Sequence, residues 1–332
     1  MKKSKIFAAI GVASAAAAGV MYAATKMLVK TALDREQPQI MKKSGDLISG
    51  GKQDEKFTAA YKSAAKKLGE TEHETIQITS HDNIKLVGHY FPCENPKRVI
   101  IAFHGWRSSW TCDYGMISDF WHKNGCSVIY VEQRGQNNSG GEYMGFGLTE
   151  RYDCVDWVEE AIRLCGDEIP IYLAGVSMGA ATVLMAADLK LPKNVHGIMA
   201  DCGFTSPRAI WKHVANNNLH ISYGMPGAIA DAFCRKKILV NSDDHSTTEA
   251  LGHTNIPVLF VHGTDDKFVP VEMTYENYKA CVSPKKLLVV PGADHAMSYY
   301  TDKNSYEKNV LEFWDEFDLK EPQENTEDED VK

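Results

Sequence analysis

The sequence lacks the cysteine spacings that hold metal ions. Its 8 cysteines include no Cys-x-x-Cys pair and no zinc-finger spacing, which argues against a structural zinc site. Most of them fall inside periodic apolar segments, so we interpret them as small core residues rather than as disulfide partners or metal ligands. The clearest such segment places its apolar positions on one helical face: Cys154, Trp157, Val158, Ala161, Leu164 and Cys165.

The chain also lacks an excess of basic residues. It has 36 Lys and Arg against 44 Asp and Glu, a net charge of −8, so no nucleic-acid partner is expected. Much of the acidity lies at residues 319–332, where we predict a disordered, solvated tail. Internal repeats are not visible, which excludes repeat architectures. The 332 residues, 44% of them hydrophobic, suit one large domain or two small ones with an ample core.

Charged residues are missing between Ile6 and Thr25, directly after a basic start. This run is long enough to cross a bilayer as one helix. We therefore predict a membrane anchor over residues 1–30, with the rest of the chain outside the cytoplasm. A signal peptide that is cleaved before secretion is the alternative. A helix lying on a membrane surface fits less well, because the run has no charged face.

Residues 31–73 are polar and rich in lysine, and we expect a stalk followed by a helix there. Strand-like and helical patterns alternate over residues 74–318. The runs 76–79 and 84–91 are separated by a polar turn and predict a hairpin. Six near-continuous apolar runs follow, and they suit buried parallel strands: Arg98–Phe103, Ser127–Val131, Ile171–Val176, Gly197–Ala200, Val258–Val261 and Lys286–Val290.

Helical patterns lie between these apolar runs. Strands that alternate with helices predict an α/β protein, with an eight-stranded, mostly parallel sheet flanked by helices on both faces. Ligands of such sheets bind beyond the carboxyl ends of the strands, and the polar motifs of this sequence lie there. The helical patterns cover residues 113–123, 150–164, 178–189, 272–281 and 306–317.

Residues 171–181 combine an apolar strand, the sequence Gly-Val-Ser-Met-Gly and an Ala-rich helix start. This is the context of a nucleophile elbow, in which Ser177 lies at the tip of a sharp strand-to-helix turn. Gly175 and Gly179 lack Cβ atoms, so the strand and the helix can cross closely. The helix N-terminus points its N–H groups at an anion that forms beside the serine. We therefore predict the N–H of Met178 as an oxyanion-hole donor.

A serine hydroxyl needs a base within hydrogen-bond reach and a third group that orients the base. Two late strand ends supply candidates. One strand is followed by the carboxylates of Asp265 and Asp266, and the last strand is followed by His295. The order Ser177, Asp266, His295 is the order of nucleophile, acid and base expected for this type of sheet.

The chain resembles the α/β-hydrolases of the serine-esterase and serine-peptidase kind, close to the serine aminopeptidase-like and prolyl-oligopeptidase-like group. The resemblance covers residues 74–317. In the family's His-Gly-x-x-Asp-x-x-Val-Pro pattern the fifth residue is the triad acid, which implies Asp266 rather than Asp265. Four motifs carry the resemblance: His104-Gly105-Trp106, Gly175-Val176-Ser177-Met178-Gly179, His262-Gly263-Thr264-Asp265-Asp266-Lys267-Phe268-Val269-Pro270 and Gly292-Ala293-Asp294-His295.

The resemblance also implies a second oxyanion donor, the backbone N–H of Trp106, and we expect the indole of this residue to border the acyl site. His104 and His262 each precede a glycine at a strand end, so we interpret them as structural hydrogen bonders rather than bases. The long excursion over about residues 203–254 predicts a small helical lid above the nucleophile.

The loop at residues 132–141 resembles the family's Asp-x-Arg-Gly-His-Gly-x-Ser loop. It departs from that pattern at its first residue and at Gln136. We interpret Arg134 as a scaffold residue of this loop, paired with Glu150 or Asp153, and not as part of the catalytic machinery.

Serine as nucleophile selects acyl transfer, whereas dehalogenases and epoxide hydrolases of this fold use aspartate. We therefore expect a serine hydrolase that cleaves carboxylic esters through an acyl intermediate on Ser177, with no metal and no organic cofactor. Peptides are the second substrate class, and an acyltransferase would carry the same triad. A non-catalytic binding module on the same scaffold is the remaining alternative.

Overall fold

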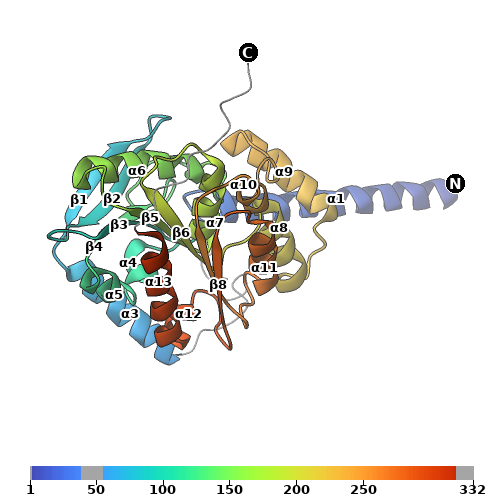
Figure 1. Cartoon of the computed structure of the whole chain (residues 1–332). Coiled ribbons are helices and arrows are strands. Elements are labelled where there is room, and N and C mark those ends of the chain that lie inside the picture. The colour runs from blue at the N-terminus through green and yellow to red at the C-terminus, as the bar shows by residue number, and fades with distance from the viewer. Residues whose placement is uncertain (1, 39–54, 319–332) are drawn as a thin grey trace, which may run out of the picture.

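The computed structural model describes residues 2–38 and 55–318, of which residues 2–17 are described by their backbone alone. At its centre lies an eight-stranded sheet with the strand order β1-β2-β4-β3-β5-β6-β7-β8 (Figure 1). The predicted number of strands is therefore confirmed. The strands are β1 (Glu74–Thr79), β2 (Lys85–Phe91), β3 (Arg98–Phe103), β4 (Cys126–Glu132), β5 (Ile171–Val176), β6 (Val195–Asp201), β7 (Val258–Gly263) and β8 (Lys285–Val290).

The sheet is mixed rather than purely parallel. β1 pairs antiparallel with β2, and β2 pairs antiparallel with β4, whereas all other neighbours are parallel. The predicted hairpin is confirmed, and it accounts for the antiparallel pairing of β1 with β2, because a short turn can join only antiparallel strands. The strands β3 to β8 run in one direction, so their carboxyl ends form a single edge.

Helices cover both faces of the sheet, because successive side chains of a strand point to opposite sides. In β3, Ile101 and Phe103 face one helical layer, and Ile100 and Ala102 face the other. The first layer contains α6 (Glu150–Cys165), α7 (Met178–Met185), α10 (Thr247–Leu251) and α11 (Val271–Ala280). The second contains α3 (Glu55–Glu70), α4 (Trp110–Tyr114), α5 (Ser118–Lys123) and α13 (Lys303–Phe317).

The helix predicted over residues 113–123 is two short helices, α4 and α5. The chain turns between them after Gly115, where an added Cβ would lie 2.6 Å from the backbone of Ala64 in α3. This close approach of two helices is a tertiary contact, so hydrophobic periodicity alone does not reveal it. All 8 cysteines lie in the described part of the chain as free thiols, and Cys154 is fully buried as predicted.

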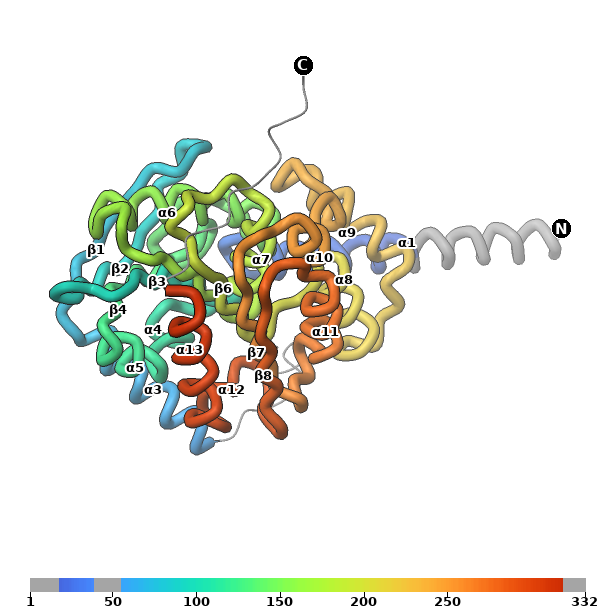
Figure 2. Tube along the Cα trace, viewed as in Figure 1, coloured from blue at the N-terminus to red at the C-terminus, as the bar shows by residue number. Residues whose placement is uncertain are grey.

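The predicted lid region contains α8 (Pro207–His213), the π-helical turn η3 (Val214–Asn218) and α9 (Gly224–Ile238). Helix α1 (Lys2–Leu33) packs with its last turns against α9 (Figure 2). Val29 and Leu33 of α1 are buried in a third apolar cluster together with Met178 and Phe204. The end of α1 is therefore part of the core of the domain.

No helix within residues 2–38 and 55–318 combines the length and the apolar character that crossing a membrane requires. The structure therefore does not support the membrane anchor, or the membrane as a partner, predicted for residues 1–30. The reason lies in the composition, because the uncharged run is largely alanine and is only weakly hydrophobic.

The stretch that follows α1 also contacts the domain, since Asp34 forms an antiparallel bridge with Tyr143. The remainder of the predicted stalk at residues 39–54 and the acidic tail at residues 319–332 lie outside the described residues.

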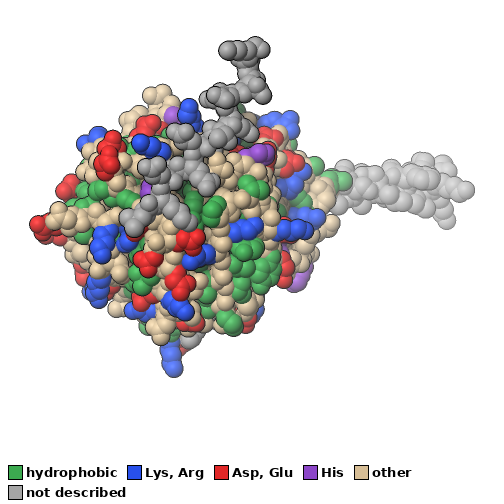
Figure 3. Space-filling model, in the orientation of Figure 1, with side chains coloured by type: hydrophobic (Ala, Val, Ile, Leu, Met, Phe, Trp, Pro, Cys, Tyr) green, Lys and Arg blue, Asp and Glu red, His purple; other side chains and the backbone are tan. Residues whose placement is uncertain are grey.

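Acidic and basic side chains are interspersed over the face of the molecule shown in Figure 3.

Candidate active site

Ser177 lies between the end of β5 and the start of α7, in the turn that the sequence predicts as a nucleophile elbow. Its φ of 56° and ψ of −114° are unusual for a residue with a side chain. A backbone in such a sparsely populated region costs on the order of 1–3 kcal/mol and is typical of functional sites. The strained turn directs the serine hydroxyl away from the sheet edge.

Two glycines make this turn possible. A Cβ on Gly175 would lie 2.3 Å from the carbonyl oxygen of Gly179, and a Cβ on Gly179 would lie 1.8 Å from the carbonyl oxygen of Phe103. Both distances are far shorter than any van der Waals contact, so only glycine fits at either position.

The structure brings Ser177, His295 and Asp266 together. Ser177 Oγ lies 2.9 Å from His295 Nε2, and His295 Nδ1 lies 2.7 Å from Asp266 Oδ2. The three residues follow β5, β8 and β7, whose carboxyl ends lie along one sheet edge, with β6 between β5 and β7. Asp265, by contrast, is exposed, and its carboxylate accepts a hydrogen bond from its neighbour Thr264.

Asp266 is buried in a set of hydrogen-bond donors. The backbone N–H groups of Phe268 and Val269 donate to its Oδ1 at 2.9 and 2.8 Å, and His262 Nε2 lies 3.1 Å from its Oδ2. Burial by itself would raise the pKa of Asp266, but the charge of His295 and the hydrogen bonds from both histidines outweigh it and hold that pKa well below its usual range. The carboxylate is therefore ionised.

The pKa of His295 moves in the opposite direction. Burial disfavours the imidazolium, but the negative charge of Asp266 outweighs this effect and raises the pKa of His295 well above its usual value. The ring of Phe268 packs edge-on against the imidazole, with 5.0 Å between the ring centroids. Phe268 thus shields the base from one side.

The loop after β3 lies against the nucleophile, where a Cβ on Gly105 would be 3.4 Å from Ser177 Cβ. The N–H of Gly105 donates to Asp113 Oδ2 at 2.6 Å, which leaves the next N–H along this loop, that of Trp106, as its candidate oxyanion donor. Met178 begins α7, so its N–H has no partner within the helix. These are the two donors that the sequence predicts.

The two remaining histidines of the motifs have structural contacts. His104 is fully buried, its Nδ1 lies 2.8 Å from the carbonyl oxygen of Gly105, and burial lowers its pKa. His262 Nδ1 lies 2.6 Å from Thr274 Oγ1. Neither of these imidazoles is hydrogen-bonded to Ser177, so His295 is the base that the geometry supports.

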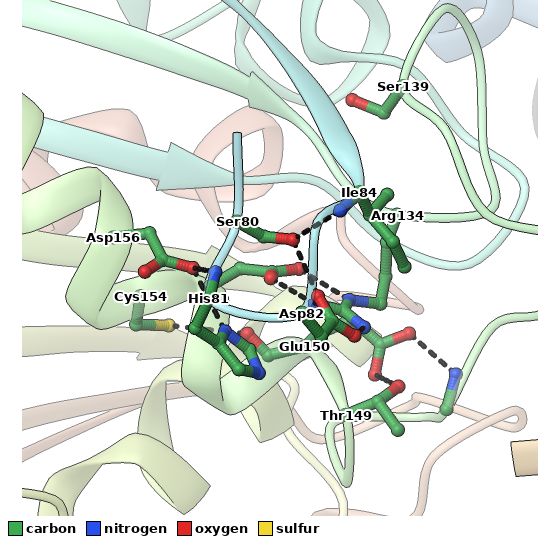
Figure 4. Close-up of polar contacts among 12 residues, drawn as sticks. Ser80, His81, Asp82, Ile84, Arg134, Ser139, Thr149, Glu150, Cys154 and Asp156 are labelled. Carbon is green, nitrogen blue, oxygen red and sulfur yellow. Dashed lines mark hydrogen bonds and ion pairs between the residues drawn. The ribbon is translucent and has the colours of Figure 1, made fainter. Parts of the chain in front are cut away.

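Arg134 joins three separate segments (Figure 4). Its guanidinium forms ion pairs with Asp153 on α6 and with Asp82 in the β1–β2 turn, the latter at 2.7 Å. Glu150, the other predicted partner, instead accepts the N–H groups of Gly145 and Gly147 at 2.6 and 2.9 Å. Arg134 is therefore a scaffold residue of its loop.

Three groups in the site were missed by the sequence analysis. Asp113 accepts a hydrogen bond from Gly105 in the loop after β3 (residues 104–109), which we call the oxyanion loop after its candidate donor. Arg107 of the same loop binds the end of α1 through its guanidinium. The thiol of Cys202, directly after β6, lies beside His295, and burial raises its pKa to about 11. The sequence offered one weak signal for Cys202, its place at a strand end.

Two groups of side chains among the described residues have donor atoms close enough to hold a metal ion. In one, Asp266 and His295 already bind each other beside Cys202. In the other, Asp82 and Asp153 are paired with the positive charge of Arg134, which opposes a cation nearby.

The α/β fold, the elbow and the hydrogen-bonded Ser-His-Asp arrangement define the class, and the protein is a serine hydrolase of the α/β-hydrolase superfamily. The model of the prolyl oligopeptidase family matches residues 113–319, more than half of the chain. The chain belongs to that family.

Individual relatives are distant. The uncharacterized protein YqkD of Bacillus subtilis is 29% identical over 195 residues, which cover 58% of this chain and 63% of that protein. A bifunctional esterase/perhydrolase of Acinetobacter calcoaceticus is 25% identical over 65% of this chain and 91% of its own length. An esterase structure from Pyrococcus furiosus superposes with a TM-score of 0.62 at 23% identity, and the match covers 76% of this chain and 93% of that one.

Proposed function

We propose that the protein hydrolyses carboxylic esters through an acyl intermediate on Ser177. The observation that carries this proposal is the unbroken hydrogen-bonded chain from Ser177 Oγ through His295 to Asp266, with distances of 2.9 and 2.7 Å. A serine is activated when a base lies within hydrogen-bond reach and a third group orients that base. Both relationships are present.

In the proposed reaction, His295 Nε2 takes the proton of Ser177 Oγ as the oxygen attacks the ester carbonyl carbon. The negative oxygen of the tetrahedral intermediate accepts hydrogen bonds from the N–H groups of Met178 and Trp106, and each donor lowers the barrier by about 3–4 kcal/mol. His295 then gives its proton to the departing alcohol. Water attacks the acyl group by the same route and releases the acid.

The cavity next to the site suits an ester better than a peptide with a free amino terminus. Its described lining residues, which include Trp106, Phe146 and Phe268, carry no charged side chain. An aminopeptidase needs a carboxylate to hold the substrate ammonium, because an unpaired buried charge is costly. The esterase names of the Acinetobacter and Pyrococcus proteins agree with this choice.

Full-length protein labelled with a fluorophosphonate tests the proposal. We expect labelling and ester hydrolysis in the wild type, loss of both in Ser177→Ala, and a strong reduction in His295→Ala. The matched control is Asp265→Asn, next to Asp266→Asn in the same turn: the former should behave as wild type and the latter should lose activity. Folded wild-type protein that neither reacts nor hydrolyses any ester would contradict the proposal.

A further inference from the structure

A cavity of about 250 Å³ lies between the last half of α1 and the lid. The described residues that line it are apolar or uncharged, so the cavity suits a hydrocarbon group. They include Ala24 and Leu28 from α1, Trp211 from α8, and Trp106, Phe146 and Phe268.

This cavity is lined by residues that lie next to the catalytic residues. Phe268 lines the cavity and packs its ring against His295. Trp106 also lines it, and the neighbouring Gly105 lies against Ser177. These two aromatic residues therefore link the surroundings of the catalytic residues with the space beside α1.

Helix α1 is fixed to the same loop that supplies the candidate oxyanion donor. The indole N–H of Trp106 donates to the carbonyl oxygen of Ala32 at 2.9 Å. The guanidinium of Arg107 donates to the carbonyl oxygens of Thr31 at 2.7 Å and Asp34 at 2.5 Å. Because the last carbonyls of a helix have no partner within the helix, these donors cap α1 and hold its last turns in place.

The lid holds α1 from the other side. Lys237 of α9 forms an ion pair with Asp34 at 2.6 Å, and both side chains are mostly buried. The rings of Tyr22 in α1 and Phe233 in α9 are in contact, with 5.7 Å between their centroids. The wall that α1 contributes is thus attached at both ends of the cavity.

We propose that α1 is one wall of the acyl-binding pocket and that the pocket takes a medium-length acyl chain. This inference rests on the proposed ester hydrolysis and names its substrate class. Since an apolar cavity of about 150 Å³ holds the six carbons of benzene, a space of 250 Å³ holds an acyl chain of roughly ten carbons. Leu28 and Ala24 on α1 then determine how long a chain fits.

Substitutions on α1 of the full-length protein test this inference. Leu28→Trp and Ala24→Trp add bulk to the wall of the cavity, and Leu28→Ala enlarges the cavity. Ala23→Trp is the matched control, because Ala23 is exposed like Ala24 but does not line the cavity. The substrates are p-nitrophenyl acetate, butyrate, octanoate and laurate, and the measurement is kcat/KM for each. Acetate has the shortest acyl group of the series, so it serves as the reference substrate that depends least on the pocket.

We expect wild type and Ala23→Trp to prefer octanoate. Leu28→Trp should lower the octanoate-to-acetate ratio of kcat/KM at least about tenfold, the size of effect that shape changes in an apolar pocket produce. Ala24→Trp should lower the ratio in the same direction, and Leu28→Ala should shift the preference toward laurate.

Different experimental results would contradict the proposed function and the assignment of α1. No hydrolysis of any ester by the wild type, together with no fluorophosphonate labelling, would overturn the proposed function. Hydrolysis with an octanoate-to-acetate ratio that is unchanged in both tryptophan variants, or with equal losses on both esters in both variants, would overturn the assignment of α1 as the acyl wall and leave the esterase proposal intact.

Discussion

The guanidinium group of Arg107 donates two hydrogen bonds to the carbonyl oxygen of Thr31, from Nη2 at 2.7 Å and from Nε at 3.0 Å. The two residues come from the loop after β3 and from the last turn of α1. The backbone N–H of Arg107 is held in turn by Gln136 Oε1 at 2.6 Å. The end of α1, the oxyanion loop and the loop after β4 are thereby joined in one hydrogen-bonded unit.

Removing this guanidinium should loosen α1. We expect Arg107→Ala to lower the free energy of unfolding by about 2 kcal/mol, because helix-end carbonyls lose charged donors. Hydrolysis of octanoate should fall more than hydrolysis of acetate. Urea unfolding and the ester series measure the two effects. Arg163→Ala is the control, since Arg163 pairs with Glu160 on the surface and should change neither quantity; an Arg107→Ala protein as stable as this control would refute the link.

The raised pKa of His295 predicts the pH dependence of activity. The base must be neutral to accept the serine proton, so kcat/KM should fall as the pH drops through the pKa of His295. Because Asp266 raises that pKa, the midpoint should lie above the usual histidine value of about 6.5. A pH profile of kcat/KM with a midpoint below that value would contradict the assignment.

Asp266→Asn separates the charge of Asp266 from its size. The amide is nearly isosteric, but it removes the negative charge and can favour the wrong imidazole tautomer, so kcat should fall by roughly four orders of magnitude. The midpoint of the remaining activity should move to lower pH, because the charge that raised the pKa of His295 is gone. Asp265→Asn should leave both the rate and the midpoint unchanged.

Gly179→Ala tests the elbow itself. The new methyl group would lie 1.8 Å from the carbonyl oxygen of Phe103, so the strand and helix cannot keep their present crossing. We expect loss of fluorophosphonate labelling together with a lower melting temperature. Gly19→Ala is the control, because a Cβ there meets nothing within 4 Å and alanine is the better helix former by about 1 kcal/mol. Normal labelling of Gly179→Ala would show that the turn tolerates a side chain.

Arg134→Ala should be costly because it leaves a charge buried without a partner. Asp153 is almost fully buried, and burial raises its pKa to about 6 in spite of the ion pair. Loss of the arginine should destabilise the protein by about 3–5 kcal/mol. Asp82→Asn removes only the ion pair between Arg134 and Asp82, in which the Asp82 carboxylate is partly exposed. This substitution should lower the free energy of unfolding by at most about 1 kcal/mol.

The stability of Arg134→Ala should also depend on pH, because this variant changes the pKa of Asp153. Without Arg134 the pKa of folded Asp153 rises further above its unfolded value, so the folded state of the variant binds the proton more tightly than the unfolded state. Its stability should therefore fall as the pH rises through that pKa, and its deficit relative to wild type should be smaller near about pH 5 than near about pH 8. Urea unfolding at both pH values measures this; a deficit that grows toward acid pH would contradict it.

Most of the sheet could be predicted from the sequence because buried parallel strands are near-continuous apolar runs. Residues 98–103 and 171–176 are predicted with the bounds that β3 and β5 have. The three side chains of the candidate triad could be placed at one sheet edge for the same reason. The division of residues 113–123 into two helices could not be predicted, because it depends on the approach of Gly115 to α3.

The position of α1 was the main feature that the sequence did not reveal. An uncharged, Ala-rich run is compatible with a membrane, a signal peptide or a protein interior, and its own composition does not distinguish them. The end of α1 is held against the domain by contacts of Thr31, Ala32 and Asp34, whose partners Arg107, Trp106 and Lys237 are distant in sequence. The contribution of Asp113 was hidden similarly, since its carboxylate faces the loop of Gly105 rather than the solvent.

The attachment of α1 has a consequence for the order of folding. α1 is synthesised before its binding partners in the loop after β3 and in α9, and domains begin to fold from their N-terminal side during synthesis. Asp266 and His295 lie further along the chain than α9. We therefore expect that α1 can make its contacts with both partners before the triad is complete, so that the acyl pocket is built before the serine becomes reactive.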